Sequence, residues 1–365
     1  MMKLTLWKFG FLLFLSSLCA YYLYCKTYAD NIYRRHYSKA VEVQHKEDVE
    51  RIVLSFVVCD SRYNESLNVV KSVLIFTKTP VYFVIFTDEN LKPKFNDTLN
   101  KWRSLTNNQL DFELQKINFP EAHEEDWMNL FSKCAAQRLF IPKLIPHIDS
   151  MIYVDTDTLF LGPVNELWSY FSRFNSSQIS AVALEDDNPN VSWYPRFAKH
   201  PFYGKYGINS GVMLMNLTRM RTFGWVDYVT PIMLKWKLYI PWGDQDIINI
   251  IFHYHERAVY VLPCRYNYRS DQCMYGDACA EATTRGIFLL HGSRKAFHNH
   301  KQPAFEAIYR AINEYNIGID STETLLNKME KYFTEAPASN CGNLKNAFFR
   351  LPIKTINDLY GKPNR

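Results

Sequence analysis

The chain has 365 residues, which is enough for one large domain or two modest ones. Its net charge is +5, and its Lys and Arg residues are scattered among acids without a basic block, so the composition argues against a nucleic-acid partner. Aromatic residues make up 16% of the chain. Their rings either stack on sugars or fill a large core, and composition alone favours the core.

An apolar segment lies near the amino terminus. Residues 9–25 carry no charge between Lys8 and Lys26, and the segment reaches about 20 residues, the length that spans a bilayer, if it starts near Leu4. A cleaved signal peptide is the alternative, but no small-x-small cleavage site follows the apolar run. We therefore predict three segments before the body of the protein: a cytosolic tail at 1–8, a transmembrane signal anchor at 9–25 and a stem at 26–50.

Sequons and cysteines favour a lumenal body. Two of the eight cysteines belong to the predicted anchor, and the remaining six form an even set, which fits disulfides in an oxidising compartment. We predict a single-pass type II protein of the endoplasmic reticulum or Golgi membrane with its catalytic body in the lumen. The five Asn-x-Ser/Thr sequons begin at Asn64, Asn96, Asn175, Asn190 and Asn216.

The cysteine spacing does not decide the pairing. No CxxC pair occurs, which disfavours a cysteine-based metal site. A small loop closed by Cys273 and Cys279 and a partner for Cys264 both remain open. The six cysteines of the body are Cys59, Cys134, Cys264, Cys273, Cys279 and Cys341.

Apolar runs alternate with helical periodicity along the body, which predicts an α/β sheet with crossover helices. Nucleotides bind such sheets at the carboxyl ends of the strands. We predict a catalytic domain at 51–320 and a carboxyl-terminal extension at 321–365, irregular past Thr334 and then loosely helical. The predicted strands are 51–59, 81–87, 110–117, 149–154, 179–184, 211–216, 258–262 and 286–290. The predicted helices are 64–77, 91–105, 131–144, 244–254 and 323–332.

Two carboxylates follow the predicted strand 149–154. Asp155 and Asp157 are separated by one residue where a buried strand opens into a loop, so both can share one hard divalent cation that also takes diphosphate oxygens. The alternative is a solvated turn, in which Asp is common. An isolated Asp-x-Asp is frequent, and its place after an apolar strand is what favours a metal site.

Amide and carboxyl groups form two further clusters. Asn209-Ser-Gly leads into an apolar strand and predicts a tight turn, either a plain β-turn or one whose amide groups suit sugar hydroxyls. Trp242-Gly-Asp-Gln-Asp opens the predicted helix 244–254. There Asp244 either caps the helix or faces a donor sugar together with Gln245.

A fourth cluster follows the predicted strand 286–290. His291 comes directly after this strand and is either a third metal ligand or a structural histidine. Arg294, Lys295 and Lys301 follow it and are available for phosphate.

The order of these four clusters resembles glycosyltransferase family 8, and the blocks around them look similar to the glucoside xylosyltransferases of that family. The similarity runs from about Arg51 to Tyr309. The matching blocks are 134–142 (CAAQRLFIP), 152–157 (IYVDTD), 196–205 (RFAKHPFYGK), 208–216 (INSGVMLMN), 242–246 (WGDQD) and 301–305 (KQPAF).

The resemblance implies a GT-A fold, in which a single mixed central sheet carries a nucleotide half and an acceptor half. It also implies a divalent metal, Mn²⁺ with Mg²⁺ as the alternative, and UDP-xylose as the donor. The family places a lysine on the donor phosphate; Lys295 and Lys301 both qualify, and the Lys-Gln-Pro sequence favours Lys301. The implied site residues are Asp155, Asp157 and His291 for the metal, Cys59 and Asp60 for uracil, Arg138 for the diphosphate, Asn209 for the donor sugar, and Asp244 and Gln245 as the catalytic pair.

The resemblance further implies a retaining transfer of xylose, in α linkage, to O-linked glucose on EGF-like repeats such as those of Notch. No acid is obviously placed as a nucleophile and the Gln245 amide is a weak one, so we expect a front-face substitution. We expect Trp242 or a neighbouring ring to fill the space near C5 that the CH₂OH group of glucose would need.

Three alternatives remain open. One is another family 8 glucosyl- or galactosyltransferase, and a second is a catalytically inactive sugar-binding protein on the same fold. The third is a metal-dependent phosphohydrolase, which would need a second ion near Asp155, held by Glu185, Asp186 and Asp187. The oligomeric state does not follow from the sequence.

Overall fold

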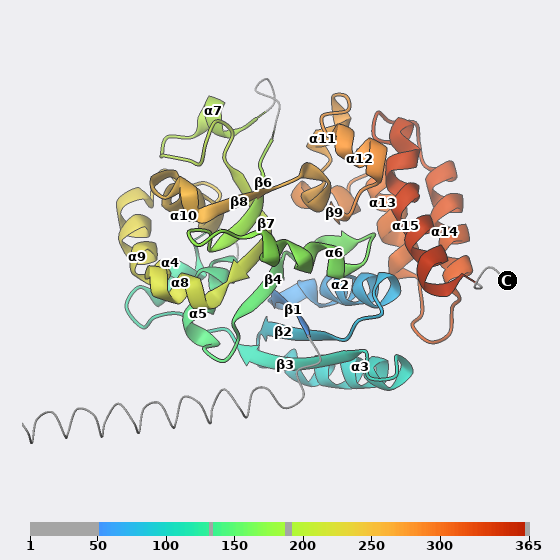
Figure 1. Ribbon diagram of the computed structural model, residues 1–365, viewed down its shortest axis with the longest axis horizontal. Coiled ribbons are helices and arrows are strands. Elements are labelled where there is room, and N and C mark those ends of the chain that lie inside the picture. Colours follow the sequence, from blue (N-terminus) through green and yellow to red (C-terminus); the bar gives the residue numbers. More distant parts are fainter. Residues whose placement is uncertain (1–50, 131–133, 187–191, 362–365) are drawn as a thin grey trace, which may run out of the picture. The chain divides into compact units, whose positions relative to one another are not determined.

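The structure is a computed structural model that describes residues 51–130, 134–186 and 192–361. From Ile52 onward these residues form one compact unit (Figure 1). The predicted tail, anchor and stem lie outside the described residues. Among the helices that are described, none has the length and apolar character needed to cross a bilayer.

A seven-stranded mixed sheet in the order β3-β2-β1-β4-β7-β6-β8 lies at the centre of this unit, which confirms the predicted α/β class. The strands β3, β2, β1 and β4 are parallel, β7 is antiparallel to both of its neighbours, and β6 is parallel to β8. A separate antiparallel pair, β5 with β9, is an addition to the predicted single sheet. The strands are β1 (Ile52–Val58), β2 (Val81–Thr87), β3 (Leu110–Lys116), β4 (Ser150–Val154), β5 (Thr158–Phe160), β6 (Ser180–Leu184), β7 (Ile208–Asn216), β8 (Val259–Leu262) and β9 (Leu289–His291).

Helices cover both faces of the sheet, and short 3₁₀ turns connect many of the elements (Figure 1). The α-helices are α2 (Tyr63–Phe76), α3 (Lys92–Leu105), α4 (Glu124–Met128), α5 (Ile141–Leu144), α6 (Val164–Trp168), α7 (Tyr194–Phe197), α8 (Leu217–Phe223), α9 (Trp225–Trp236), α10 (Asp244–Tyr254), α11 (Asp271–Met274), α12 (Ala280–Arg285), α13 (Pro303–Asn313), α14 (Thr322–Glu335) and α15 (Lys345–Tyr360). The 3₁₀ turns are η1 (Asp60–Arg62), η2 (Ala135–Phe140), η3 (Ser169–Arg173), η4 (Glu256–Ala258), η5 (Cys264–Asn267), η6 (Ser293–His298) and η7 (Gly342–Leu344).

The central strands bury both faces, which explains their continuous apolar sequences. In β1, Leu54 and Phe56 belong to the core cluster on one side of the sheet, while Val53 and Val57 pack against the cluster on the other side. Successive side chains of a strand point to opposite faces, so a strand covered by helices on both sides is mainly apolar. The one polar side chain of β1, Ser55, is buried and donates to the carbonyl of Val84 at 2.7 Å. The same alternation places Phe83 and Val84 of β2 in different clusters.

Strand pairing brings the separate motifs to one edge of the sheet. β7 runs antiparallel to β4, so the beginning of β7 lies beside the end of β4, and the backbone N–H of Asp155 donates to the carbonyl of Gly211 at 2.8 Å. The pairing of β5 with β9 sets Thr158 opposite His291, and the N–H of Gly292 donates to the carbonyl of Asp157 at 2.7 Å. The predicted metal ligands therefore meet.

Two local predictions are wrong. The segment 131–144 is not one helix, because Cys134 adopts a left-handed conformation (φ 73°) and is followed by η2 and then α5, which has a proline in its first turn. Asn209-Ser-Gly is not a tight turn but part of β7. Asn209 pairs with Ala183 of β6, and the carbonyl of Gly211 accepts from the N–H of Asp155 just beyond β4. The register of β6 against β7 shifts between Val182 and Ala183, so Ser210 and Gly211 lie at an irregularity of the sheet.

The segment predicted as a carboxyl-terminal extension packs onto the rest of the compact unit. α14 lies against α13, and α15 lies against α2 and α12 (Figure 1). The loosely helical tail of the prediction is instead a regular helix of 16 residues, because Phe348 and Leu351 bury one face of it in the core. It tolerates Pro352 in its interior.

The six cysteines of the body pair as predicted for an oxidising compartment. The disulfides are Cys59–Cys134, Cys264–Cys279 and Cys273–Cys341. The partner of Cys264, which the sequence left open, is Cys279. The predicted small loop closed by a Cys273–Cys279 disulfide is therefore wrong. Cys273 instead reaches the carboxyl-terminal extension, a contact that spacing along the chain could not reveal.

A partly buried ion pair links α6 to η5. The Glu166 carboxylate accepts hydrogen bonds from Arg265 at 2.6 Å and from the Tyr266 hydroxyl at 2.5 Å. Partial burial alone would raise the pKa of Glu166, but these two hydrogen bonds outweigh burial and lower it. A carboxyl whose pKa is lowered by folding stabilises the folded state above its unfolded pKa, and that contribution is lost as the pH falls.

We expect Glu166→Gln to lower the free energy of unfolding at pH 7 by about 1–3 kcal/mol, because Arg265 loses its charged partner. The difference from the wild type should shrink as the pH falls below about 4.3, where the carboxyl of the unfolded chain becomes protonated. Urea unfolding at pH 7 and at acid pH, with the disulfides intact, measures both. Exposed Glu121 provides the control variant Glu121→Gln. If the difference in the free energy of unfolding between the wild type and Glu166→Gln does not depend on pH, the Glu166 carboxylate is not the source of the stabilisation.

Candidate active site

Three predicted metal ligands converge at the end of β4. Oxygen atoms of Asp155 and Asp157 and a ring nitrogen of His291 all lie within 4.8 Å of one another. The Nε2 atom of His291 is 3.4 Å from Asp157 Oδ1 and 3.8 Å from Asp155 Oδ2. Two carboxylates and an imidazole nitrogen aimed at one point form a donor set that suits Mn²⁺.

Hydrogen bonds on the far side of the ring orient His291. Its Nδ1 atom lies 2.8 Å from the Asn267 Oδ1 atom, while the Asn267 amide donates to Asn209 Oδ1, also at 2.8 Å. Because Asn267 Oδ1 can only accept, the hydrogen of the ring is on Nδ1, and the lone pair of Nε2 is left for a metal. This is the outer support that metal-binding histidines ordinarily have.

Gly211 makes room for the histidine. A Cβ atom at this position would lie 2.2 Å from Cε1 of His291, so no other residue fits there without moving the ring. The glycine of the Asn-Ser-Gly motif is thus required by the close approach of β7 to His291. The sequence prediction explained Gly211 by a tight turn, and that explanation is wrong.

The charges of the cluster keep Asp157 ionised. Burial alone would raise the pKa of Asp157, but when Nε2 of His291 carries a proton in place of a metal ion, its hydrogen bond and charge outweigh burial and lower that pKa. The charge of Arg62 acts in the same direction. An ionised carboxylate is the form that binds a divalent cation.

Arg138 bridges Asp155, a predicted metal ligand, and Asp244, a predicted catalytic residue. Its Nη2 atom is 3.1 Å from Asp155 Oδ1, and its Nε atom pairs with Asp244 Oδ2. Burial alone would lower the pKa of Arg138, but Asp155 and Asp244 outweigh burial and raise it. The prediction that Arg138 and Asp244 belong to one site is consistent with this geometry. Asp244 is the first residue of α10 rather than its cap, which is Gly243.

Gln245 is held firmly by its neighbours. Its carbonyl oxygen accepts from the Ser210 N–H at 3.1 Å, and its amide nitrogen donates to the Tyr194 hydroxyl at 3.2 Å and to Glu185 at 3.5 Å. Glu185 also accepts from the Asn209 amide at 2.8 Å. A buried carboxylate therefore lies directly beside the predicted catalytic amide.

A cavity of about 320 Å³ opens over these groups. It contains three cationic side chains besides Arg138, and the ammonium of Lys295 has no partner among the residues that the structure describes. Arg294 and Lys295 both have left-handed backbone conformations (φ 56° and 62°), a strained arrangement that clusters at functional sites. The lining residues are Arg62, Arg138, Asp155, Asp157, Glu185, Asn209, Ser210, Trp242, Asp244, Gln245, His291, Ser293, Arg294 and Lys295.

Three predicted site residues do not line this cavity. Lys301 lines a second cavity, described below. Cys59 is buried and its sulfur is bonded to Cys134, so only its backbone is left for a nucleobase. Asp60 begins η1 beside it, and its side chain is outside what the structure describes.

Sequence reasoning missed Arg62 and Asn267. Arg62 follows the end of β1 by a few residues, and that position at the carboxyl edge of the sheet was the available signal. Asn267 lies in η5, between two clusters of the prediction, and nothing in its local sequence marks it. Of the carboxylates considered for a second ion, Glu185 points instead to Asn209, Gln245 and Arg294. Asp187 lies outside the described residues.

We expect Asn267→Ala to weaken Mn²⁺ binding by about 10- to 100-fold, because it removes the group that fixes the hydrogen of His291 on Nδ1. Asp157→Asn should weaken binding at least as much, since it removes a ligand. Titration with Mn²⁺, followed by calorimetry or by the electron paramagnetic resonance of the free ion, gives the affinities. The exposed Asp97 of α3 supplies the control Asp97→Asn. Unchanged affinity in both site variants rules out this metal site.

Comparisons with known proteins agree with this geometry. The model of glycosyl transferase family 8 matches residues 52–295. The chain is 42% identical to glucoside xylosyltransferase 1 of Mus musculus over 325 residues, which are 86% of this chain and 80% of the relative. It is 44% identical to glucoside xylosyltransferase 1 of Danio rerio over 306 residues, 81% of this chain and 76% of the relative.

Solved structures agree on the fold. The apo crystal structure of mouse xyloside xylosyltransferase 1 superimposes with a TM-score of 0.50 at 18% identity, covering 67% of this chain and 98% of that one. At this identity the likeness shows the fold alone, and the sequence relatives carry the assignment. The chain belongs to glycosyltransferase family 8 and, within it, to the glucoside xylosyltransferases.

Proposed function

We propose that this protein is a retaining xylosyltransferase that moves xylose from UDP-xylose, in α linkage, to O-linked glucose on EGF-like repeats. The observation that carries the proposal is the convergence of Asp155, Asp157 and His291 beside a polar cavity in a chain of this family. The relatives with the highest identities quoted above are named for xylosyl transfer to a glucoside.

In this proposal the donor diphosphate lies between the metal ligands and the basic side chains of the cavity. Bound Mn²⁺ would neutralise the negative charge that develops on the departing UDP. Arg62 and Lys295 supply further positive charge at the same cavity. Lys295 takes the place that the family pattern suggested for Lys301, because it lines the cavity of the metal ligands and has no partner among the described residues.

Retention of configuration fits a front-face substitution. The Gln245 carbonyl oxygen is already engaged by Ser210, so the amide is oriented as part of the wall rather than presented as a nucleophile. Glu185 lies beside it and places negative charge near the sugar, where positive charge develops as the glycosidic bond to the phosphate breaks. The departing phosphate oxygen is the group that takes the proton of the acceptor hydroxyl.

Selectivity for xylose is assigned to the aromatic side of the cavity. Trp242 lines the cavity and packs edge-on against Trp193, with ring centroids 5.6 Å apart. The backbone N–H of Trp242 donates to the buried carboxylate of Asp246 at 2.7 Å. This hydrogen bond fixes the backbone that carries the indole ring. A rigid wall disfavours the extra CH₂OH of glucose, by about 1–3 kcal/mol.

The cellular setting is proposed from covalent chemistry. Three disulfides fit an oxidising compartment, and the sequon residues Asn64, Asn96 and Asn175 are exposed. The side chain of Asn216 caps α8 instead, accepting from the N–H of Arg219 at 2.8 Å. These features support a lumenal catalytic body in the endoplasmic reticulum or Golgi, anchored by residues 9–25.

A donor screen on an O-glucosylated EGF-like repeat tests this proposal. We expect transfer from UDP-xylose to exceed transfer from UDP-glucose and UDP-galactose by at least about tenfold, the lower end of what one CH₂OH group allows. Chelation with EDTA should abolish transfer and added Mn²⁺ restore it. Equal rates with all donors remove the xylosyl assignment, and full activity in EDTA removes the metal.

Gln245→Ala tests the front-face mechanism. We expect kcat to fall on the order of 10²-fold without vanishing, because the variant loses an oriented dipole but no covalent partner. Glu185→Gln should likewise keep residual turnover. The affinity for UDP with Mn²⁺ serves as the control for folding. Complete loss in Glu185→Gln, together with a glycosyl adduct on Glu185 in the wild type detected by mass spectrometry, would support double displacement instead.

A further inference from the structure

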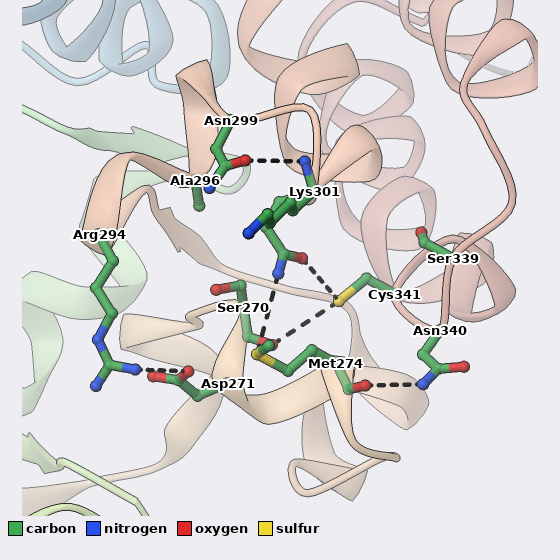
Figure 2. Close-up of a pocket in the computed structure, with 11 residues that line it drawn as sticks. Ser270, Asp271, Met274, Arg294, Ala296, Asn299, Lys301, Ser339, Asn340 and Cys341 are labelled. Carbon is green, nitrogen blue, oxygen red and sulfur yellow. Dashed lines mark hydrogen bonds and ion pairs between the residues drawn. The ribbon is translucent and has the colours of Figure 1, made fainter.

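A second cavity, of about 340 Å³, has one lining residue in common with the donor cavity. That residue is Arg294. Figure 2 shows its guanidinium directed at Asp271, with which it pairs at 3.0 Å. The two cavities therefore have a common wall at Arg294. The second cavity is lined by Ser270, Asp271, Met274, Arg294, Ala296, Asn299, Lys301, Gln302, Ser339, Asn340 and Cys341.

The walls of this cavity are fixed by covalent and hydrogen bonds. The disulfide Cys273–Cys341 joins the extension to α11, and the Asn340 amide donates to the Met274 carbonyl at 2.7 Å (Figure 2). Ser339 and Asn340 come from the carboxyl-terminal extension, which lies beyond the part of the chain that the family model matches. The extension thus completes a preformed site, and preformed sites lose little entropy on binding.

Gln302 is the observation that points to a ligand. This glutamine is only 8% exposed, and among the described residues the partners of its side-chain amide are two sulfur atoms, Met274 Sδ at 3.9 Å and Cys341 Sγ at 3.7 Å. A disulfide sulfur carries no hydrogen, so Cys341 cannot donate to the amide oxygen. A thioether is a weak acceptor. A buried amide without strong partners is costly, and a group on a ligand would satisfy it.

The chemistry of the lining fits a polypeptide. A side-chain amide can donate to and accept from one backbone peptide group at the same time. The ammonium of Lys301 has no partner among the described residues, so it favours a carboxylate on the ligand. Met274 and Ala296 add apolar surface between these polar groups.

We propose that this cavity binds the polypeptide of the acceptor next to its glucosylated residue, with Gln302 on a backbone peptide group and Lys301 on an acidic side chain. The inference rests on the proposed function, since it takes the acceptor to be a glycoprotein. In this arrangement the glucose is the only part of the acceptor that enters the donor cavity. The extension then determines which polypeptide is accepted. A diphosphate is the other anion that Lys301 could meet, and the experiment below separates the two.

The test compares two acceptors in Gln302→Leu and Lys301→Ala: an O-glucosylated EGF-like repeat, and an aryl β-glucoside without polypeptide. We expect KM for the repeat to rise about tenfold in each variant, the loss of roughly one hydrogen bond or ion contact. The KM for UDP-xylose and kcat/KM for the aryl glucoside should stay within twofold of the wild type. Lys331→Ala, at an exposed position of α14, is the matched control.

Equal losses on both acceptors, no loss on either, or a raised KM for UDP-xylose would each overturn the proposal, the last by placing Lys301 or Gln302 on the donor. Binding of the unglucosylated repeat to the protein with UDP and Mn²⁺, measured by calorimetry, needs no transfer. This binding should weaken in both variants. If the donor assignment is wrong, transfer from UDP-xylose fails but the weakened binding remains; if the acceptor cavity is wrong, binding of the repeat is unchanged. Unfolding temperatures show whether Gln302→Leu remains folded.

Discussion

The pairing of β5 with β9 is the constraint on which the site depends. These two short strands lie far apart in the sequence, and their register sets His291 opposite Thr158, next to the second aspartate of the metal motif. Without that pairing, Asp155 and Asp157 would be two carboxylates at the end of a strand, which are common and weak as a metal site. With it, an imidazole nitrogen completes the donor set.

A connected set of buried polar groups keeps this arrangement in place. Asn209 links Asn267, which orients His291, to Glu185, which contacts Gln245. Networks of this kind are rigid when every member is satisfied and costly when one is removed. Substitutions among these residues should therefore not be additive, and the loss of one group will affect both the three candidate metal ligands and the wall of the cavity at Gln245.

The carboxyl-terminal extension contributes both to the core and to the lining of the second cavity. It adds α14 and α15 to the core, and the Cys273–Cys341 disulfide joins it to the segment that forms one wall of the second cavity. A helical extension of this kind could serve packing alone. The side-chain amide of Gln302 has only weak partners among the described residues and lies in the cavity that the extension helps to line. This amide is the observation that favours a binding role over a purely structural one.

The sequence by itself determined the α/β class and the positions of the central strands, because strands that are buried on both faces have continuous apolar runs. It also singled out Asp155, Asp157 and His291 as candidate metal ligands, because each of them follows or ends an apolar strand. It also fixed an even number of cysteines. Only the tertiary structure decided that Asn209-Ser-Gly is strand, that Cys273 pairs with Cys341, that Asn267 orients His291, and that Lys295 rather than Lys301 lines the cavity of the metal ligands. These features depend on contacts between residues distant in the chain, and local pattern carries no information about which distant residues meet.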